Sequence, residues 1–252
     1  GSFSVSSATV NTTFLNTNTV EYKGSYVSQD SPYFDWTGNL QAIRLNAITG
    51  LPTSTVLWSA QTMLDTLVAG TGWQNARFIA TWDAVNNVGI PFQSANLNTT
   101  QRNLLRFGAT TSQTTVQYIR GNTALEQRNG GTLRNRSHIL GDIVDSQAAY
   151  VGPPNGTNLS SSYLAFARAQ LNRTPMVYVG ANDGMLHAFN ASTGQEAFAF
   201  IPNAMFPILY NLATPLYNQS HLFFVDGSPV SGDVQFSNGT WHTLVVGGEN
   251  AG

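Results

Sequence analysis

The stretch Met176–Pro202, MVYVGANDGMLHAFNASTGQEAFAFIP, decides the fold of this chain. Three runs rich in apolar and aromatic residues alternate with two turn signals, Asn-Asp-Gly at 182–184 and Ser-Thr-Gly at 192–194. Glycine after Asp or Asn supplies the positive φ that a tight turn needs, and residues two apart share one face of a strand. The stretch therefore predicts strand, turn, strand, turn, strand.

A second copy of this pattern lies nearer the start of the chain. The aligned pairs are Gly38 with Gly184, Leu40 with Leu186, Ala42 with Ala188, and Ile43 with Phe189. Both copies then reach Asn-Ala and Thr-Gly, at Asn46–Gly50 and at Asn190–Gly194, and the first copy is two residues longer. Two linked hairpins make most of a four-stranded blade, so the internal repeat predicts a β-propeller in which the first glycine of each copy sits in a turn.

Other segments fit blades and the connections between them. Strands are predicted in RFIATWD (77–83), ILGDIVDSQAAYVG (139–152), FFVDGSPVSGDVQF (223–236) and WHTLVVGG (241–248), the last as a buried inner strand. Apolar spacing predicts helical insertions within residues 98–110, 160–172 and 202–213. We therefore predict an all-β, quinoprotein-like β-propeller over residues 31–252 with short helical insertions, preceded by a strand or extended leader over residues 1–30.

Composition narrows the classes of protein. Charged residues make up 10% of the 252 residues and the net charge is −2, which disfavours nucleic-acid binding and a polybasic membrane patch. The apolar runs are too short to span a bilayer. The absence of cysteine excludes disulfides, thiolate nucleophiles and cysteine-based zinc sites. Gly1-Ser2 is typical of a cloning remnant that replaces a signal peptide, and the polar, aromatic composition favours an extracellular protein.

Several long blocks resemble the C-terminal propeller of the PilC/PilY family, the type IV pilus biogenesis factors and tip adhesins of Gram-negative bacteria. These blocks are RNRSHILGDIVDSQAAYVG (134–152), the opening stretch extended to residue 207, FFVDGSPVSGDV (223–234) and WHTLVVGG (241–248). YFDWTGNLQAIRL (33–45) and VLWSAQTML (56–64) are similar to the start of the same propeller. The resemblance covers roughly residues 30–252. Because the family propeller continues beyond the final Gly-Gly, we expect this chain to form only some of its blades.

The resemblance implies a scaffold that is not an enzyme, at the cell surface, the pilus tip or the outer membrane. Its expected partners are minor pilins or the pilus tip, and a host or abiotic surface. Loop contacts are predicted at Trp73 in AGTGWQNAR, Tyr163 at the end of VGPPNGTNLSSSY and Tyr217 in PLYNQSH. Two alternatives stay open: a docking platform for minor pilins without host contact, and a quinoprotein-like dehydrogenase that binds a quinone cofactor.

No cofactor or metal is expected in this chain. The family often carries a calcium loop of the form D-x-[DN]-x-[DN]-G, whose alternating oxygen ligands encircle the ion, and no segment here has that spacing. Asp142 and Asp145 are three apart, and Asn182 is adjacent to Asp183. We interpret Asp142, Asp183, Asp226 and Asp233 as turn formers whose carboxylates accept backbone N–H bonds.

Catalytic motifs are also missing. The sequence has no G-x-S-x-G, H-E-x-x-H or nucleotide-binding glycine motif. We expect His187 to be exposed or to bond between blades, and Arg134 and Arg136 to bond backbone carbonyls or Asp142. Of the tryptophans, Trp58 and Trp241 are predicted to be core, since Trp at a strand end often packs between blades.

Overall fold

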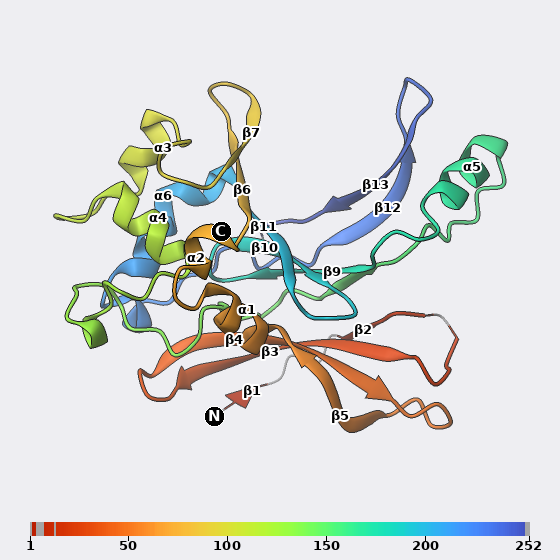
Figure 1. Cartoon of the computed structure of the whole chain (residues 1–252), viewed down its shortest axis with the longest axis horizontal. Helices are drawn as coiled ribbons and strands as arrows, with labels where there is room; N and C mark the ends of the chain where they lie inside the picture. Colours follow the sequence, from red (N-terminus) through yellow and green to blue (C-terminus); the bar gives the residue numbers. More distant parts are fainter. Residues whose placement is uncertain (1, 4–7, 13, 250–252) are drawn as a thin grey trace.

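Figure 1 shows the computed structural model of the chain, which describes residues 2–3, 8–12 and 14–249. Gly1 of the expected cloning remnant lies outside these residues. Within them, the strands form a five-stranded, a six-stranded and a two-stranded sheet. The strands are β1 (Ser2–Phe3), β2 (Ala8–Val10), β3 (Val20–Asp30), β4 (Asp35–Leu45), β5 (Pro52–Ser59), β6 (Ile79–Asp83), β7 (Val88–Pro91), β8 (Ala149–Val151), β9 (Met176–Ala181), β10 (Met185–Asn190), β11 (Glu196–Ile201), β12 (Val230–Gln235) and β13 (Trp241–Val246).

The predicted strands of the opening stretch are confirmed. β9, β10 and β11 form an antiparallel meander, and β8 pairs with the outer edge of β9. Gly184 occupies the first turn with a φ of 89°, as a tight turn requires. β6, predicted from RFIATWD, joins the other edge, but it pairs parallel to β11 with Ala199 opposite Ile79. The result is a four-stranded meander extended by β6 and β7.

The first sheet holds a second antiparallel meander, β2-β3-β4-β5, with β1 also paired to β3. The division expected at residue 30 falls in the turn of the β3–β4 hairpin, so it has no counterpart in the sheet. Of the two alternatives expected for residues 1–30, residues 20–30 form a strand, and alternate positions in its first half, residues 20–24, are buried.

The second turn of the repeat has the same hydrogen bonds in both copies. In one copy the Asn46 side chain accepts the N–H groups of residues 48 and 49, and the Gly50 N–H donates to the Asn46 carbonyl at 2.8 Å. In the other, Asn190 accepts the N–H groups of residues 192 and 193, and the Gly194 N–H donates to the Asn190 carbonyl at 2.8 Å. Both glycines have positive φ, 71° and 73°. The same Asx-turn therefore closes both hairpins.

The turn predicted at the first glycine of the repeat is wrong for the first copy. Gly38 lies inside strand β4, and the β3–β4 turn is formed instead at Ser31–Phe34. Gly38 is small for a different reason: a Cβ there would lie 2.0 Å from the carbonyl oxygen of Gly141. The Gly38 N–H also donates to the Leu140 carbonyl at 3.1 Å. The glycine allows two backbones to cross.

Short helices connect the strands. They are α1 (Ala60–Val68), α2 (Gly72–Asn75), α3 (Thr99–Leu104), α4 (Ser112–Arg120), α5 (Ser161–Ala169), α6 (Phe206–Leu209) and the 3-10 segments η1 (Gln127–Asn129), η2 (Asn203–Met205), η3 (Tyr210–Ala213) and η4 (Tyr217–Gln219). The helices expected within residues 98–110, 160–172 and 202–213 are confirmed, while α1, α2 and α4 were not predicted. α4 has the sequence SQTTVQYIR, whose β-branched residues favour strands, and it forms because its apolar side chains are buried.

Buried apolar residues gather in two clusters. One lies between the two larger sheets and includes Trp58, which packs on Gly194 and donates from its indole N–H to the Ala191 carbonyl at 3.0 Å. The repeated turn of one sheet is thus packed against a tryptophan of the other, as predicted for Trp58. The second cluster joins the six-stranded sheet to α4, α6 and the residues that flank α3, and includes Phe92 and Phe206.

The β12–β13 hairpin rises away from the larger sheets (Figure 1). The buried inner strand predicted for residues 241–248 is wrong, since Leu244 and Val246 are 39% and 60% exposed. Trp241 is half-buried rather than core. The described strands are predominantly antiparallel meanders that do not close into a ring.

Candidate binding pocket and buried polar network

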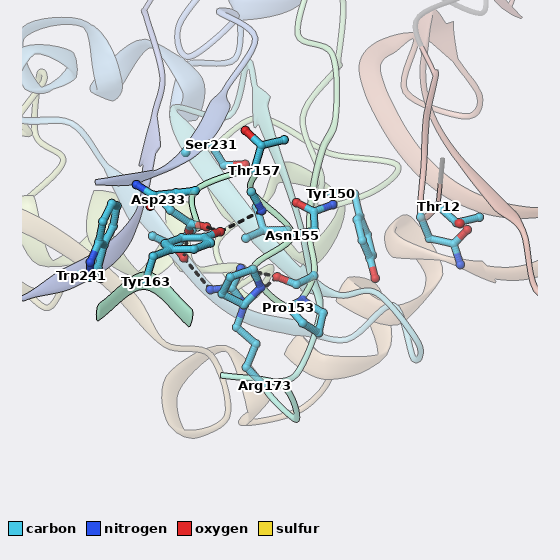
Figure 2. A pocket seen from close by; sticks show the side chains of 18 of the residues that line it. Thr12, Tyr150, Pro153, Asn155, Thr157, Tyr163, Arg173, Ser231, Asp233 and Trp241 are labelled. Carbon is cyan, nitrogen blue, oxygen red and sulfur yellow. Dashed lines mark hydrogen bonds between the residues drawn. The ribbon is translucent and has the colours of Figure 1, made fainter. Parts of the chain in front are cut away.

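A cavity of about 840 Å³ opens where three parts of the chain meet (Figure 2). Residues 150–158 and α5 with Arg173 form one part, the β12–β13 hairpin forms the second, and residues 10–12 form the third. This volume is within the usual range of small-molecule sites. We therefore regard this pocket as the candidate functional site.

A chain of hydrogen bonds joins the segments beneath the pocket. Arg173 donates to the Gly152 carbonyl and, at 2.6 Å, to the Thr243 hydroxyl. That hydroxyl donates to Asp233, whose second oxygen accepts from the Tyr163 hydroxyl at 2.7 Å. The network ties β12 and β13 to the loop and helix opposite, so the two sides of the pocket are held in fixed positions.

Aromatic rings stand on opposite sides of the pocket. Figure 2 shows Trp241 and Tyr163 on one side and Tyr150 on the other. The Trp241 ring meets Tyr163 edge-to-face at 4.9 Å between centroids and donates from its indole N–H to Ser162 at 3.1 Å. Tyr150 stacks on Tyr22 with centroids 5.8 Å apart. Each ring is therefore oriented by a neighbour rather than free to rotate.

A separate network of buried charges connects the segment just before β6 with β10 and β11. The guanidinium of Arg77 bonds both oxygens of Glu196, at 2.7 and 3.0 Å. Glu196 also lies 2.8 Å from Nδ1 of His187, whose Nε2 is 3.1 Å from Asp183. The side chains of Arg77, Glu196 and His187 are at most 1% exposed.

The network shifts the pKa values of its members. Burial alone would lower the pKa of His187, but the charge of Asp183 and the hydrogen bonds to Asp183 and Glu196 raise it to about 9. Burial would raise the pKa of Glu196, but the positive charge of Arg77 and its hydrogen bonds to His187 and Arg77 lower it to about 2. The imidazole is thus held protonated between two carboxylates. The expectation that His187 is exposed or bonds between blades is wrong, because it is fully buried and its partners lie in the same β9–β10–β11 meander.

The other acidic residues also have partners. Asp142 binds the Asn182 side chain at 2.7 Å and His221 at 2.9 Å, and Trp36 stacks on His221. Asp226 accepts the N–H of Asp145 at 3.0 Å. Asp183 accepts the Gly141 N–H at 3.1 Å. Across the described residues, no group of three or more His, Cys, Asp or Glu side chains could hold a metal ion.

The structure separates the three predicted contact residues. Tyr163 lies in the first turn of α5, 2% exposed, with its hydroxyl in the pocket network. Tyr217 is 3% exposed, donates to the Leu222 carbonyl and lines a water-sized cavity of about 20 Å³. Trp73 is half-buried in α2 and lines a third cavity of about 440 Å³ with Asp65 and Arg128. Ligand contact by these residues stays a prediction.

The two clustered arginines bond carbonyls, as expected. Arg134 donates to the Leu212 carbonyl at 2.8 Å and lies over the Tyr217 ring. Arg136 donates to the Tyr118 carbonyl and to Glu126, both at 2.9 Å, instead of to Asp142.

Sequence reasoning missed Arg173 and Asp233 as pocket residues and assigned Trp241 to the core. Arg173 follows a helix and Asp233 lies in a strand of a hairpin distant in the sequence. No rule of sequence spacing predicts that such residues lie together. The only indication in the sequence is the abundance of polar residues in the loop 152–160.

Comparison with known proteins gives consistent matches. The family described as the PilY1 beta-propeller domain matches residues 140–252. The chain is 37% identical over 247 residues to a type IV pilus biogenesis factor PilY1 homolog of Xylella fastidiosa, covering 93% of this chain and 18% of that protein. It is also 37% identical over 250 residues to the type IV pilus biogenesis factor PilY1 of Pseudomonas aeruginosa strain PAK, covering 92% of this chain and 20% of that protein. No solved structure matches the chain.

The chain thus spans about a fifth of the length of these relatives. Both are named as pilus biogenesis factors, so the quinoprotein alternative gains no support. In the described part of the chain, no helix has the length and apolar character needed to cross a membrane.

Proposed function

Because this chain belongs to the PilY1 family over 92% of its length, we propose that it forms blades of a propeller in a type IV pilus biogenesis factor. The proposed roles are pilus assembly and attachment to a surface, at the pilus tip or the outer membrane. The family match of residues 140–252 to a propeller domain supports this, and so do the two stacked antiparallel meanders.

One observation favours binding over catalysis. The buried acids and His187 bond one another, and the two charged residues of the pocket, Arg173 and Asp233, are both engaged in hydrogen bonds that hold its sides together. Apart from the remaining lone pairs of Asp233, the groups left to meet a ligand are amide, hydroxyl and aromatic side chains. Such a surface recognises a partner but offers no activated nucleophile or general base.

A second role, as a docking platform for minor pilins, is favoured by the β12–β13 hairpin. Val230 and Val246 are paired across its strands and are 63% and 60% exposed. Exposed apolar pairs of this kind are typical of surfaces that another protein covers. The two roles are compatible, because the pocket and these valines are different parts of the hairpin.

The test uses a strain that lacks the gene. Piliation, twitching and surface adhesion should all fall, and the whole wild-type protein should restore them. Retention of all three activities in the deletion strain would contradict the proposal. A whole protein carrying Ser231→Trp, which fills the pocket from an exposed position, should restore piliation but not adhesion. Ser237→Trp, at the exposed turn of the same hairpin, is the matched control and should restore both.

A further inference from the structure

We infer that the 840 Å³ pocket binds a neutral oligosaccharide. The inference rests on the proposed attachment role, for which it names the class of ligand. Several segments of the chain border the pocket, as Figure 2 shows. It therefore suits an extended molecule of a few units.

The aromatic side chains supply apolar contact surfaces for sugar rings. Trp241 and Tyr150 lie on opposite sides of the pocket, and each is oriented by another aromatic ring, Tyr163 and Tyr22 respectively. A pyranose ring presents C–H groups on its flat faces, which pack on the negative face of an aromatic ring. Because the two rings are held in advance, little side-chain entropy is lost when a sugar binds.

Polar groups with unused hydrogen-bonding capacity surround these rings. Asn155 and Thr157 are exposed, and within the described residues their side chains have no hydrogen-bond partner. Each oxygen of Asp233 accepts one hydrogen bond from the protein, which leaves a lone pair on each. The amide and hydroxyl groups both donate and accept, as sugar hydroxyls do, so they match a polyhydroxylated ligand.

The charged side chains that line the pocket favour a neutral ligand over an ionic one. Among the residues that line the pocket, the charged side chains are one cation, Arg173, and one anion, Asp233, which are joined through the Thr243 hydroxyl, so the net charge of the lining is zero. A phosphate or sulfate ligand would favour several cations, and a cationic ligand several carboxylates, whereas the lining has one of each sign. Besides Asp233, the polar side chains that are free to meet a ligand are amides and hydroxyls.

The experiment measures binding of the purified whole protein to an array of neutral and sialylated oligosaccharides, followed by titration of the best neutral glycan. We expect binding to a neutral glycan, weakened about tenfold or more by Trp241→Ala and by the double substitution Asn155→Ala/Thr157→Ala. Asn103→Ala, at an exposed position of α3, should bind as the wild type does.

Several results would overturn the inference: no glycan bound, a requirement for sialic acid, or binding unchanged by both pocket variants. Binding of a peptide library in the pocket in place of glycans would also overturn it. Asn155 and Thr157 make no internal bonds among the described residues, so their double variant should fold even if Trp241→Ala does not. Because the assay does not depend on piliation, its failure is distinct from failure of the role in pilus assembly.

Discussion

At the scale of single residues, His187 has an unusual environment for a histidine. It is fully buried, lies between the carboxylates of Asp183 and Glu196, and stacks on Phe189 with ring centroids 5.5 Å apart. Arg77 completes the network and donates to the carbonyls of residues 119 and 120. The two carboxylates face two cations, so the network is close to neutral and each charge is hydrogen-bonded. Removing one member leaves an unpaired buried charge.

This network should make stability depend on pH in two directions. Protonated His187, whose pKa rises from 6.5 to about 9, stabilises fully below pH 6.5, and its contribution disappears as pH rises through about 9. Ionised Glu196, whose pKa falls from 4.5 to about 2, contributes above pH 4.5 and loses its effect as pH falls toward about 2. Between pH 4.5 and 6.5 both contributions are complete.

Urea unfolding across this pH range tests the prediction. His187→Gln should lower the free energy of unfolding at about pH 5 by roughly 3 kcal/mol, because both carboxylates lose a cation. It should also reduce the decline in stability between about pH 7 and 10. Parallel pH profiles for wild type and variant would contradict the assignment. His242→Gln, at an exposed position of β13, is the matched control.

At the scale of elements, glycine allows the segment 139–142 to cross β4. Gly38 and Gly141 meet there, and the next close approach lies between Gly141 and the backbone N–H of Asp183. Each crossing is joined by a hydrogen bond. The Gly38 N–H donates to the Leu140 carbonyl, and the Gly141 N–H donates to the Asp183 carboxylate. The segment therefore connects the first sheet to the second without regular strand pairing.

Gly38→Ala should separate these backbones. The new Cβ would lie 2.0 Å from the Gly141 oxygen, and neither backbone can rotate away, so we expect a loss of about 2–4 kcal/mol in the free energy of unfolding. Gly232→Ala is the control, because a Cβ in β12 meets no atom within 4 Å. Denaturant unfolding of both variants provides the comparison. Equal stability of the two would show that the crossing tolerates a side chain.

At the scale of the whole molecule, the sheets differ in how well they are covered. The five-stranded and six-stranded sheets share a buried core, and helices cover the six-stranded sheet through the second cluster. The β12–β13 hairpin lacks such cover in the described structure, since Val230, Leu244 and Val246 are each at least 39% exposed. A paired strand ribbon with exposed apolar residues is a surface for association.

We expect the isolated chain to self-associate through this hairpin. Val230→Ser/Val246→Ser should reduce association, because it removes the exposed cross-strand apolar pair without changing the backbone pairing. Light scattering over a concentration series measures the mass of each form. Val85→Ser/Val88→Ser, which alters exposed valines next to and in β7, should leave association unchanged. If the two variants reduced association equally, association would depend on exposed apolar residues in general and not on this hairpin.

The sequence by itself determined those turns, strands and helices that depend on local interactions. The Asn46 and Asn190 turns, the strands of residues 176–201 and the capped helices α3 and α5 depend on hydrogen bonds between residues a few positions apart. Such bonds form in the same way wherever the segment is placed, so turn and capping residues identify them. The repeat and its family resemblance follow from the same local patterns.

Tertiary structure decided the features that join distant segments. It placed Gly38 in a backbone crossing rather than a turn, paired β6 parallel to β11, and enclosed His187 between carboxylates. It also assembled the pocket from Arg173, Asp233 and residues of the loop between β8 and α5. Each of these depends on which surfaces are desolvated together when the sheets pack. Burial changes the free energy of holding a charge and the room available for a side chain. The role of a glycine or a histidine therefore depends on where it is buried, which its neighbours in sequence do not specify.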